Sequence, residues 1–92
     1  MRVAPYATFG TAALADGLVE ALEGRSAALL ASHGAITIGD TLPRAYDRSL
    51  ILESIAAAYV RAQALGMPKV IPDAEVAVLI EKMSGYGQVR PA

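Results

Sequence analysis

Cysteine is absent from the chain, and histidine occurs once, at His33. The absence of cysteine excludes a disulfide framework and any thiolate nucleophile or metal ligand, and it is typical of a cytoplasmic protein. A catalytic zinc ion needs about three protein ligands. His33 alone therefore does not make a metal site, although Asp40 and Glu53 are carboxylates that a metal ion could recruit.

Charge is also sparse. Only 18% of the residues are charged, and the formal net charge is -1. The sequence has no basic cluster of the kind that binds nucleic acid or anionic lipid, and no apolar run approaches the roughly 20 residues of a membrane span. The basic residues are scattered along the chain: Arg2, Arg25, Arg44, Arg48, Arg61, Lys69, Lys82 and Arg90.

The chain is short and apolar, with 92 residues of which 54% are hydrophobic. A domain of this size buries only about 60 to 70% of the surface of its unfolded chain. Such a domain needs a polar exterior, and this composition supplies little of one. We therefore expect the chain to cover further apolar surface, either in a homo-oligomer or against the missing part of a larger domain.

Two short apolar runs meet at the histidine. Residues 27–31 read as a buried strand that ends at Ser32, His33 and Gly34, and residues 35–38 alternate like a second strand. Because neighbouring strand residues point to opposite faces, Ser32 and His33 do not form a serine–histidine pair. A histidine at this turn is compatible with a structural role or with a ligand role.

Three helices are predicted around this hairpin. Thr11 is a suitable N-cap for the first helix, and Asp40 or Thr41 is one for the second. The segment before the first helix is predicted to be extended, because Pro5 disfavours helical backbone there. The predicted helices cover residues 11–23, 42–65 and 73–83, and residues 88–92 are expected to form a loose tail.

Two further residues have open interpretations. Glu53 falls on the apolar side of the second predicted helix, where a carboxylate is costly unless it is paired. It either bonds to an amide or an arginine, lies in an exposed subunit contact, or supports His33 or a neighbouring active site. Tyr86 stands between two glycines, and it either docks on another element or supplies a functional hydroxyl.

Several separate stretches together resemble one family. They are APYATFGT at residues 4–11, ALLASHGA at residues 28–35, a helix that carries Glu53 and Tyr59, and GYG at residues 85–87. In this order they resemble the C-terminal half of the class II aldolase/adducin family. L-fuculose-phosphate aldolase and L-ribulose-5-phosphate 4-epimerase are its best-known enzyme types.

The resemblance implies an α/β fold: the C-terminal half of an α/β/α layered domain with a central, mostly antiparallel sheet. It also implies a homotetramer with active sites between subunits and a divalent metal, usually zinc, held by three histidines. His33 matches the metal ligand that comes from a histidine–glycine turn in the family. Tyr86 matches a catalytic tyrosine, a proton donor that is contributed across the subunit interface.

The chain also departs from the family pattern. No H-x-H motif precedes His33, and no acidic base or phosphate-binding loop stands upstream of it. We therefore expect residues 1–92 to be a partial domain, inactive alone, that contributes to zinc-dependent aldol cleavage of a small sugar phosphate or related hydroxy-carbonyl compound. The alternatives are a sugar-phosphate epimerase and a non-catalytic interaction or assembly module of the adducin type.

Overall fold

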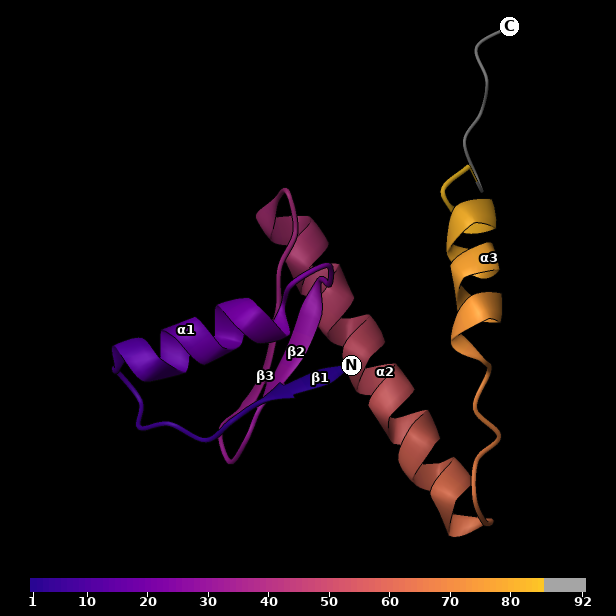
Figure 1. The fold of residues 1–92 in the computed structure, drawn as a ribbon, viewed down its shortest axis with the longest axis horizontal. Coiled ribbons are helices and arrows are strands. Elements are labelled where there is room, and N and C mark those ends of the chain that lie inside the picture. Colours follow the sequence, from indigo (N-terminus) through magenta and orange to yellow (C-terminus); the bar gives the residue numbers. More distant parts are fainter. Residues whose placement is uncertain (86–92) are drawn as a thin grey trace, which may run out of the picture. The chain divides into compact units, whose positions relative to one another are not determined.

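The computed structural model of the chain describes residues 1–85 (Figure 1). The chain divides into two compact units, one up to Arg61 and one from Ala62 onward, which are described separately. The expected tail at residues 88–92 lies outside the described residues. The elements are β1 (Arg2–Ala4), α1 (Ala12–Ala21), β2 (Ala27–Leu30), β3 (Gly34–Thr37), α2 (Leu42–Ala64) and α3 (Asp73–Met83).

A small mixed sheet organises the first unit, with strand order β1-β2-β3. β1 pairs with β2 in parallel, and Ala4 lies opposite Leu30. β2 pairs with β3 antiparallel, and Leu30 lies opposite Gly34. The prediction of two strands that meet at His33 is thus confirmed, and so is the α/β class. The parallel pairing with β1 was not predicted.

The core of the first unit lies between the sheet and α1. Ala4, Ala21 and Ala28 are buried together, with Leu18 and Ile36 packed against them. α1 begins at the predicted N-cap, because the Thr11 hydroxyl accepts the amide hydrogen of Leu14 at 3.3 Å. Small residues at these contacts let the helix approach the strands closely, so this core contains little apolar volume.

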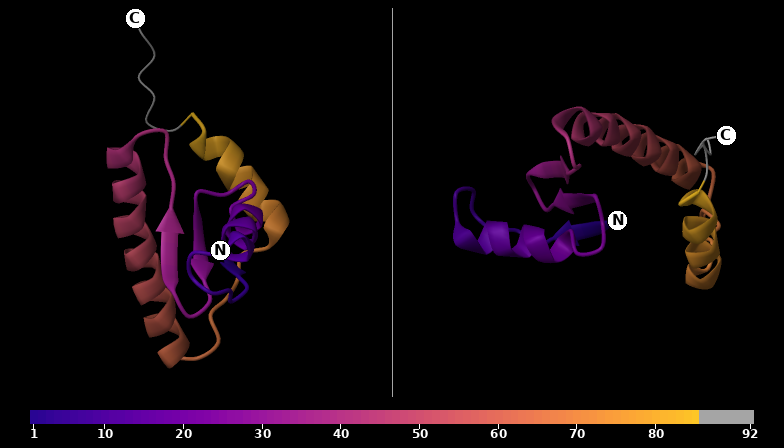
Figure 2. Two further views of the ribbon diagram at one scale, coloured as in Figure 1. Left: turned by 90° about the vertical axis from the view of Figure 1, so that its left-hand side faces the viewer. Right: turned by 90° about the horizontal axis from the view of Figure 1, so that it is seen from above.

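α2 lies on the face of the sheet opposite α1, which gives the three layers implied by the resemblance (Figure 2). Thr37 of β3 donates its hydroxyl hydrogen to the carbonyl of Ala45 at 2.7 Å. Arg48 donates to the carbonyl of Ile38, also at 2.7 Å. The hydroxyl of Thr41 accepts the amide hydrogen of Arg44 at 3.3 Å, which confirms it as a helix cap. The bonds of Thr37 and Arg48 join the start of α2 to the end of β3.

In the second unit, α3 begins and ends where the sequence predicts. Pro72 supplies no side-chain cap, and its carbonyl accepts the amide hydrogens of Glu75 and Val76. Asp73 and Glu75 in the first turn, with Lys82 in the last, oppose the partial charges of the helix ends.

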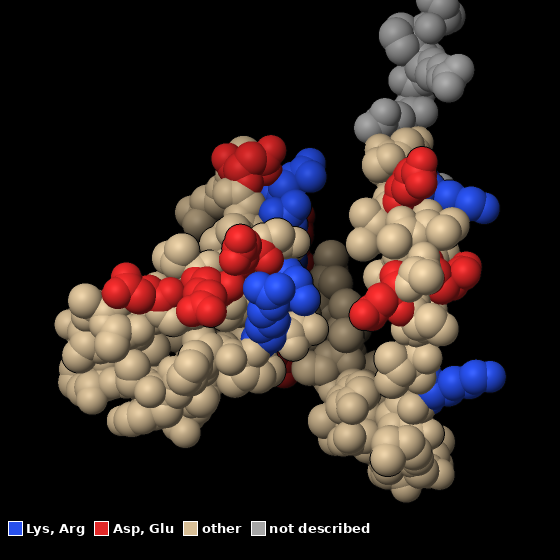
Figure 3. Space-filling view, viewed as in Figure 1, with Lys and Arg blue, Asp and Glu red and all other residues tan. Residues whose placement is uncertain are grey.

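Much of the apolar content of the chain is exposed. Among residues 1–85 no large side chain is completely buried, whereas Phe9 is 79% exposed and Leu42 is 83% exposed. The face drawn in Figure 3 is accordingly formed mostly by uncharged residues. The helices of this described part are too short or too polar to cross a membrane.

Candidate functional site

His33 lies in the tight turn between β2 and β3. Its amide donates to the carbonyl of Leu30 at 3.0 Å. Ser32 just before it has a φ of 62°, in the left-handed region that residues other than glycine rarely adopt. Such backbone strain is found most often at functional sites. The turn leaves the imidazole exposed at the end of the sheet.

The parallel pairing of β1 and β2 determines which residues the imidazole of His33 contacts. Since Ala4 lies opposite Leu30 at the end of both strands, the segments that carry Ala7 and His33 leave the sheet at the same edge. The amide of Ala31, directly after β2, donates to the carbonyl of Ala4 at 3.1 Å, so the two segments are joined where both strands end. The Nε2 atom of His33 then lies 2.8 Å from the carbonyl oxygen of Ala7.

Tyr6 lies beside the same ring. The ring centroids of Tyr6 and His33 are 5.5 Å apart, and their planes differ by only 8°. This is a stacked pair, an arrangement in which aromatic side chains contribute about 0.5 to 1.5 kcal/mol beyond the area that they bury. The imidazole is therefore held at one edge by a hydrogen bond and on one face by a second ring.

The hydrogen bond also assigns the proton on the imidazole. A carbonyl oxygen only accepts, so Nε2 of His33 must carry the hydrogen and donate it to Ala7. In the neutral ring, the lone pair then resides on Nδ1. Histidines that ligate metals typically donate their other ring N–H to a carbonyl or carboxylate in this way. The contact with Ala7 thus fits a metal ligand as well as a structural histidine.

The described residues supply one candidate ligand and not a whole site. In the described part of the chain no three histidine, aspartate or glutamate side chains gather as a metal cluster would require. The carboxylate of Asp40 is paired with Arg44 at 3.3 Å, on an exposed surface. A divalent metal at His33 would therefore need donors from outside residues 1–85.

The other two candidate residues are less defined by the fold. Glu53 is exposed on α2, so the expected cost of burying its carboxylate does not arise within this chain. Among its interpretations, that exposure is compatible with a subunit contact. Tyr86 lies outside the described residues.

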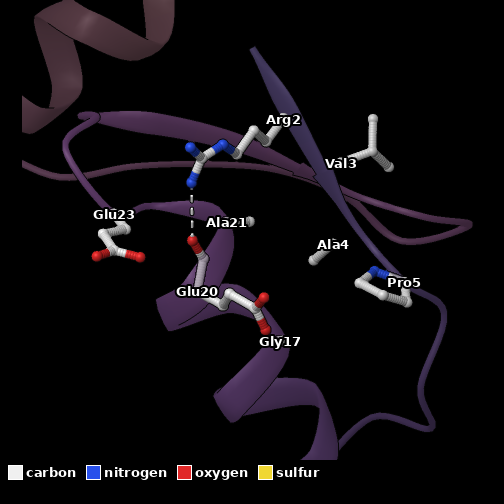
Figure 4. Close-up of a pocket in the computed structure, with 8 residues that line it drawn as sticks. All are labelled: Arg2, Val3, Ala4, Pro5, Gly17, Glu20, Ala21 and Glu23. Carbon is white, nitrogen blue, oxygen red and sulfur yellow. Dashed lines mark hydrogen bonds between the residues drawn. The ribbon is translucent and has the colours of Figure 1, made fainter.

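A separate hollow lies between β1 and α1, with a volume of about 600 Å³ (Figure 4). Arg2 reaches across it and donates to the backbone carbonyl of Glu20 at 3.3 Å. Glu20 and Glu23 place two carboxylates beside this single guanidinium, so the hollow is poorly suited to a phosphate. His33 is not among its lining residues, and we assign the hollow no part in the candidate site.

Sequence reasoning missed Tyr6 as a member of the site. Tyr6 was visible only as part of the APYATFGT stretch, 27 positions before His33. The signal that places it is the parallel pairing of β1 with β2, because the carboxyl ends of parallel strands lie at the same edge of a sheet.

Comparisons with known proteins identify the family of the chain. Residues 1–60 match the sequence model of a family described as Class II Aldolase and Adducin N-terminal domain. The chain is 40% identical over 88 residues to 5-deoxy-D-ribulose 1-phosphate aldolase of Bacillus thuringiensis, which covers 96% of this chain and 41% of that protein.

Two further relatives are similar to the same extent. A 5-methylthioribulose-1-phosphate/5-deoxyribulose-1-phosphate aldolase of Rhodospirillum rubrum is 40% identical over 87 residues, covering 95% of this chain and 39% of that protein. The L-fuculose phosphate aldolase of Escherichia coli is 40% identical over 85 residues, covering 91% and 40%. The chain thus spans about two fifths of the length of the curated relatives it matches. It belongs to the class II aldolase/adducin family.

Proposed function

We propose that this chain contributes one metal ligand, His33, to the active site of a zinc-dependent aldolase that cleaves a small sugar phosphate. The observation that carries the proposal is the contact of the His33 Nε2 atom with the Ala7 carbonyl at 2.8 Å. It orients the imidazole and leaves the second ring nitrogen with its lone pair, as is typical of metal-bound histidines.

The names of three relatives favour a phosphorylated ketose as the substrate class. These proteins are aldolases named for 5-deoxyribulose 1-phosphate, 5-methylthioribulose 1-phosphate and L-fuculose phosphate. Aldol cleavage of a ketose 1-phosphate breaks the bond between C3 and C4. The C4 hydroxyl loses its proton and becomes an aldehyde, the bonding electron pair stays on C3, and C3 is then protonated.

The residues of this chain have two roles in that proposal. A bound divalent metal would withdraw electron density from the oxygens beside C3 and so stabilise the developing negative charge. His33 holds its ring ready to serve as one of the ligands. We propose Tyr86 of a neighbouring subunit as the proton donor, acting through its hydroxyl.

A partner is part of the proposal, because this chain supplies one ligand of about three. The exposed apolar side chains of α2, among them Leu50, Ile51 and Ile55, support contact with further protein. We propose that the rest of a complete aldolase domain, assembled as a homotetramer, covers this surface and supplies the remaining ligands. The proposed setting is the cytoplasm, where the lack of cysteine is ordinary.

The experiment is a chimera in which this chain replaces the matching segment of the Rhodospirillum rubrum relative. We expect the purified, folded chimera to release dihydroxyacetone phosphate from 5-deoxyribulose 1-phosphate, and its His33→Ala variant to lose this activity. A folded, zinc-loaded chimera without any cleavage activity would contradict the proposal. Release of an epimerised pentose phosphate instead would favour the epimerase alternative.

One observation favours a second candidate, a non-catalytic interaction or assembly module of the adducin type. The apolar surface of α2 is extensive, whereas only four hydrophobic residues are buried in the part of the chain that the structure describes. An inactive chimera that still forms the oligomer of the parent enzyme would support this alternative. We place it second, because it gives no role to the orientation of His33.

A further inference from the structure

We propose that Tyr6 is a positioning residue for the His33 imidazole: its ring fixes the plane of the imidazole while the Ala7 carbonyl fixes the nitrogen that carries the hydrogen. This inference rests on the proposed function in one respect only, namely that the oriented imidazole binds a metal ion. The stack and the hydrogen bond are properties of the chain itself.

The backbone on both sides of the contact is restrained, so the two rings are held next to each other. Pro5 fixes its own φ immediately before Tyr6. On the other segment, the amide of His33 is bonded to the carbonyl of Leu30. The amide of Ala31 is bonded to the carbonyl of Ala4, which ties the two segments together directly before the rings.

Two restraints are sufficient to orient this side chain. An imidazole on a fixed backbone has two rotatable bonds, and each is limited by one contact. The hydrogen bond from Nε2 to the Ala7 carbonyl fixes the direction in which the ring extends. The stack at 5.5 Å with an 8° difference between planes fixes its rotation about the last bond.

Orientation matters because His33 is exposed. An exposed imidazole without these contacts exchanges between rotamers and between its two neutral tautomers. If a histidine has to be ordered when the metal binds, the metal affinity is lower. Loss of a group that holds a ligating histidine in place typically lowers metal affinity 10- to 100-fold. Tyr6 would prevent this loss through its ring, and its hydroxyl is not needed for the stack.

The chain offers a favourable test, because it has a single histidine whose ring signals are easily assigned by NMR. The variants are Tyr6→Leu, which removes the ring, and Tyr6→Phe, which keeps it. Tyr46→Leu is the matched control, since Tyr46 on α2 is 63% exposed, as Tyr6 is. All spectra are recorded on the full chain, with dispersed amide signals as the criterion for a folded sample.

In the unmodified chain and in Tyr6→Phe, we expect upfield-shifted His33 ring protons and nitrogen shifts of the tautomer that is protonated at Nε2. In Tyr6→Leu the ring protons move downfield and the two nitrogen shifts converge, whereas Tyr46→Leu leaves them unchanged. A folded Tyr6→Leu sample with unaltered His33 signals would overturn the proposal. So would the absence of a nuclear Overhauser effect between the two rings in the unmodified chain, a measurement that needs no variant.

Zinc affinity in the chimera separates this inference from the proposed function. We expect Tyr6→Leu to weaken zinc binding about tenfold and Tyr6→Phe to restore it. If zinc binds and both variants match the unmodified chimera, the positioning role fails and the ligand role stands. If the chimera binds no zinc while the NMR signature of the stack is present, the proposed function fails and the orienting contacts stand.

Discussion

Gly39 lies directly against the backbone of Ala45, where the loop after β3 turns into α2. A Cβ atom added at Gly39 would be 2.8 Å from the amide nitrogen of Ala45 and 3.2 Å from the carbonyl oxygen of Thr41. Both neighbours are backbone atoms that take part in the first turn of the helix, so they have little freedom to move away.

Replacement of Gly39 by alanine is therefore expected to destabilise the fold by about 1 to 3 kcal/mol, the usual range for forced overpacking. Urea denaturation followed by circular dichroism measures the change in the free energy of unfolding. Gly17→Ala is the matched control, since a Cβ there would only make an ordinary 3.7 Å contact with Pro5. In the interior of α1 it should stabilise by about 0.5 to 1 kcal/mol. Equal effects of the two substitutions would be inconsistent with the close approach at Gly39.

The turn before His33 supports a second prediction. Ser32 has a φ of 62°, a conformation that is most unfavourable for β-branched side chains and is tolerated by asparagine. Ser32→Val should lower the free energy of unfolding by about 1 to 2 kcal/mol, while Ser32→Asn should equal or exceed the unmodified chain. If valine were accommodated as easily as asparagine, the left-handed turn would not exist in solution.

The sequence predicts the features that are specified by residues close together in the chain. Helix limits depend on neighbouring residues, and Thr11 and Thr41 marked the starts of the first two helices closely. The hairpin at His33 is also a local feature, with its turn at Ser32 and Gly34. The pairing of β1 with β2 is not local, because α1 lies between the strands and no residue in either strand specifies the partner.

That missing pairing explains why the candidate site was incomplete at the sequence level. His33 was recognisable from its turn and from a family resemblance, whereas Tyr6 and the Ala7 carbonyl become neighbours of His33 only through the register of β1 on β2. Glu53 shows a different limit of helical periodicity, which does not tell whether an apolar side is covered within the chain. Helical periodicity placed it on an apolar side, but that part of α2 is exposed in this chain, so no burial cost arises.

Glu53 has a prediction of its own. If its carboxylate supports the active site, Glu53→Gln in the folded chimera should reduce the rate of cleavage at least tenfold while the midpoint of urea denaturation changes little, because the side chain is exposed. A stable and fully active Glu53→Gln chimera would return the residue to a role in subunit contact or to an ordinary exposed position.

Tyr86 is predicted to act in chemistry rather than in metal binding. Tyr86→Phe removes only the hydroxyl, so turnover should fall by about 100-fold or more, the range for loss of a general acid. The zinc content of the same preparation should remain that of the unmodified chimera. Unchanged turnover would exclude the proton-donor role, whereas loss of zinc would reassign the residue to the integrity of the site.

The ligand role of His33 can be measured as the amount of zinc bound per chain. The chimera, its His33→Ala variant and the Tyr46→Leu control are dialysed in parallel against zinc-free buffer and analysed by elemental mass spectrometry. We expect stoichiometric zinc in the chimera and the control and a large loss of zinc in His33→Ala. Stoichiometric zinc retained by folded His33→Ala would contradict the ligand role.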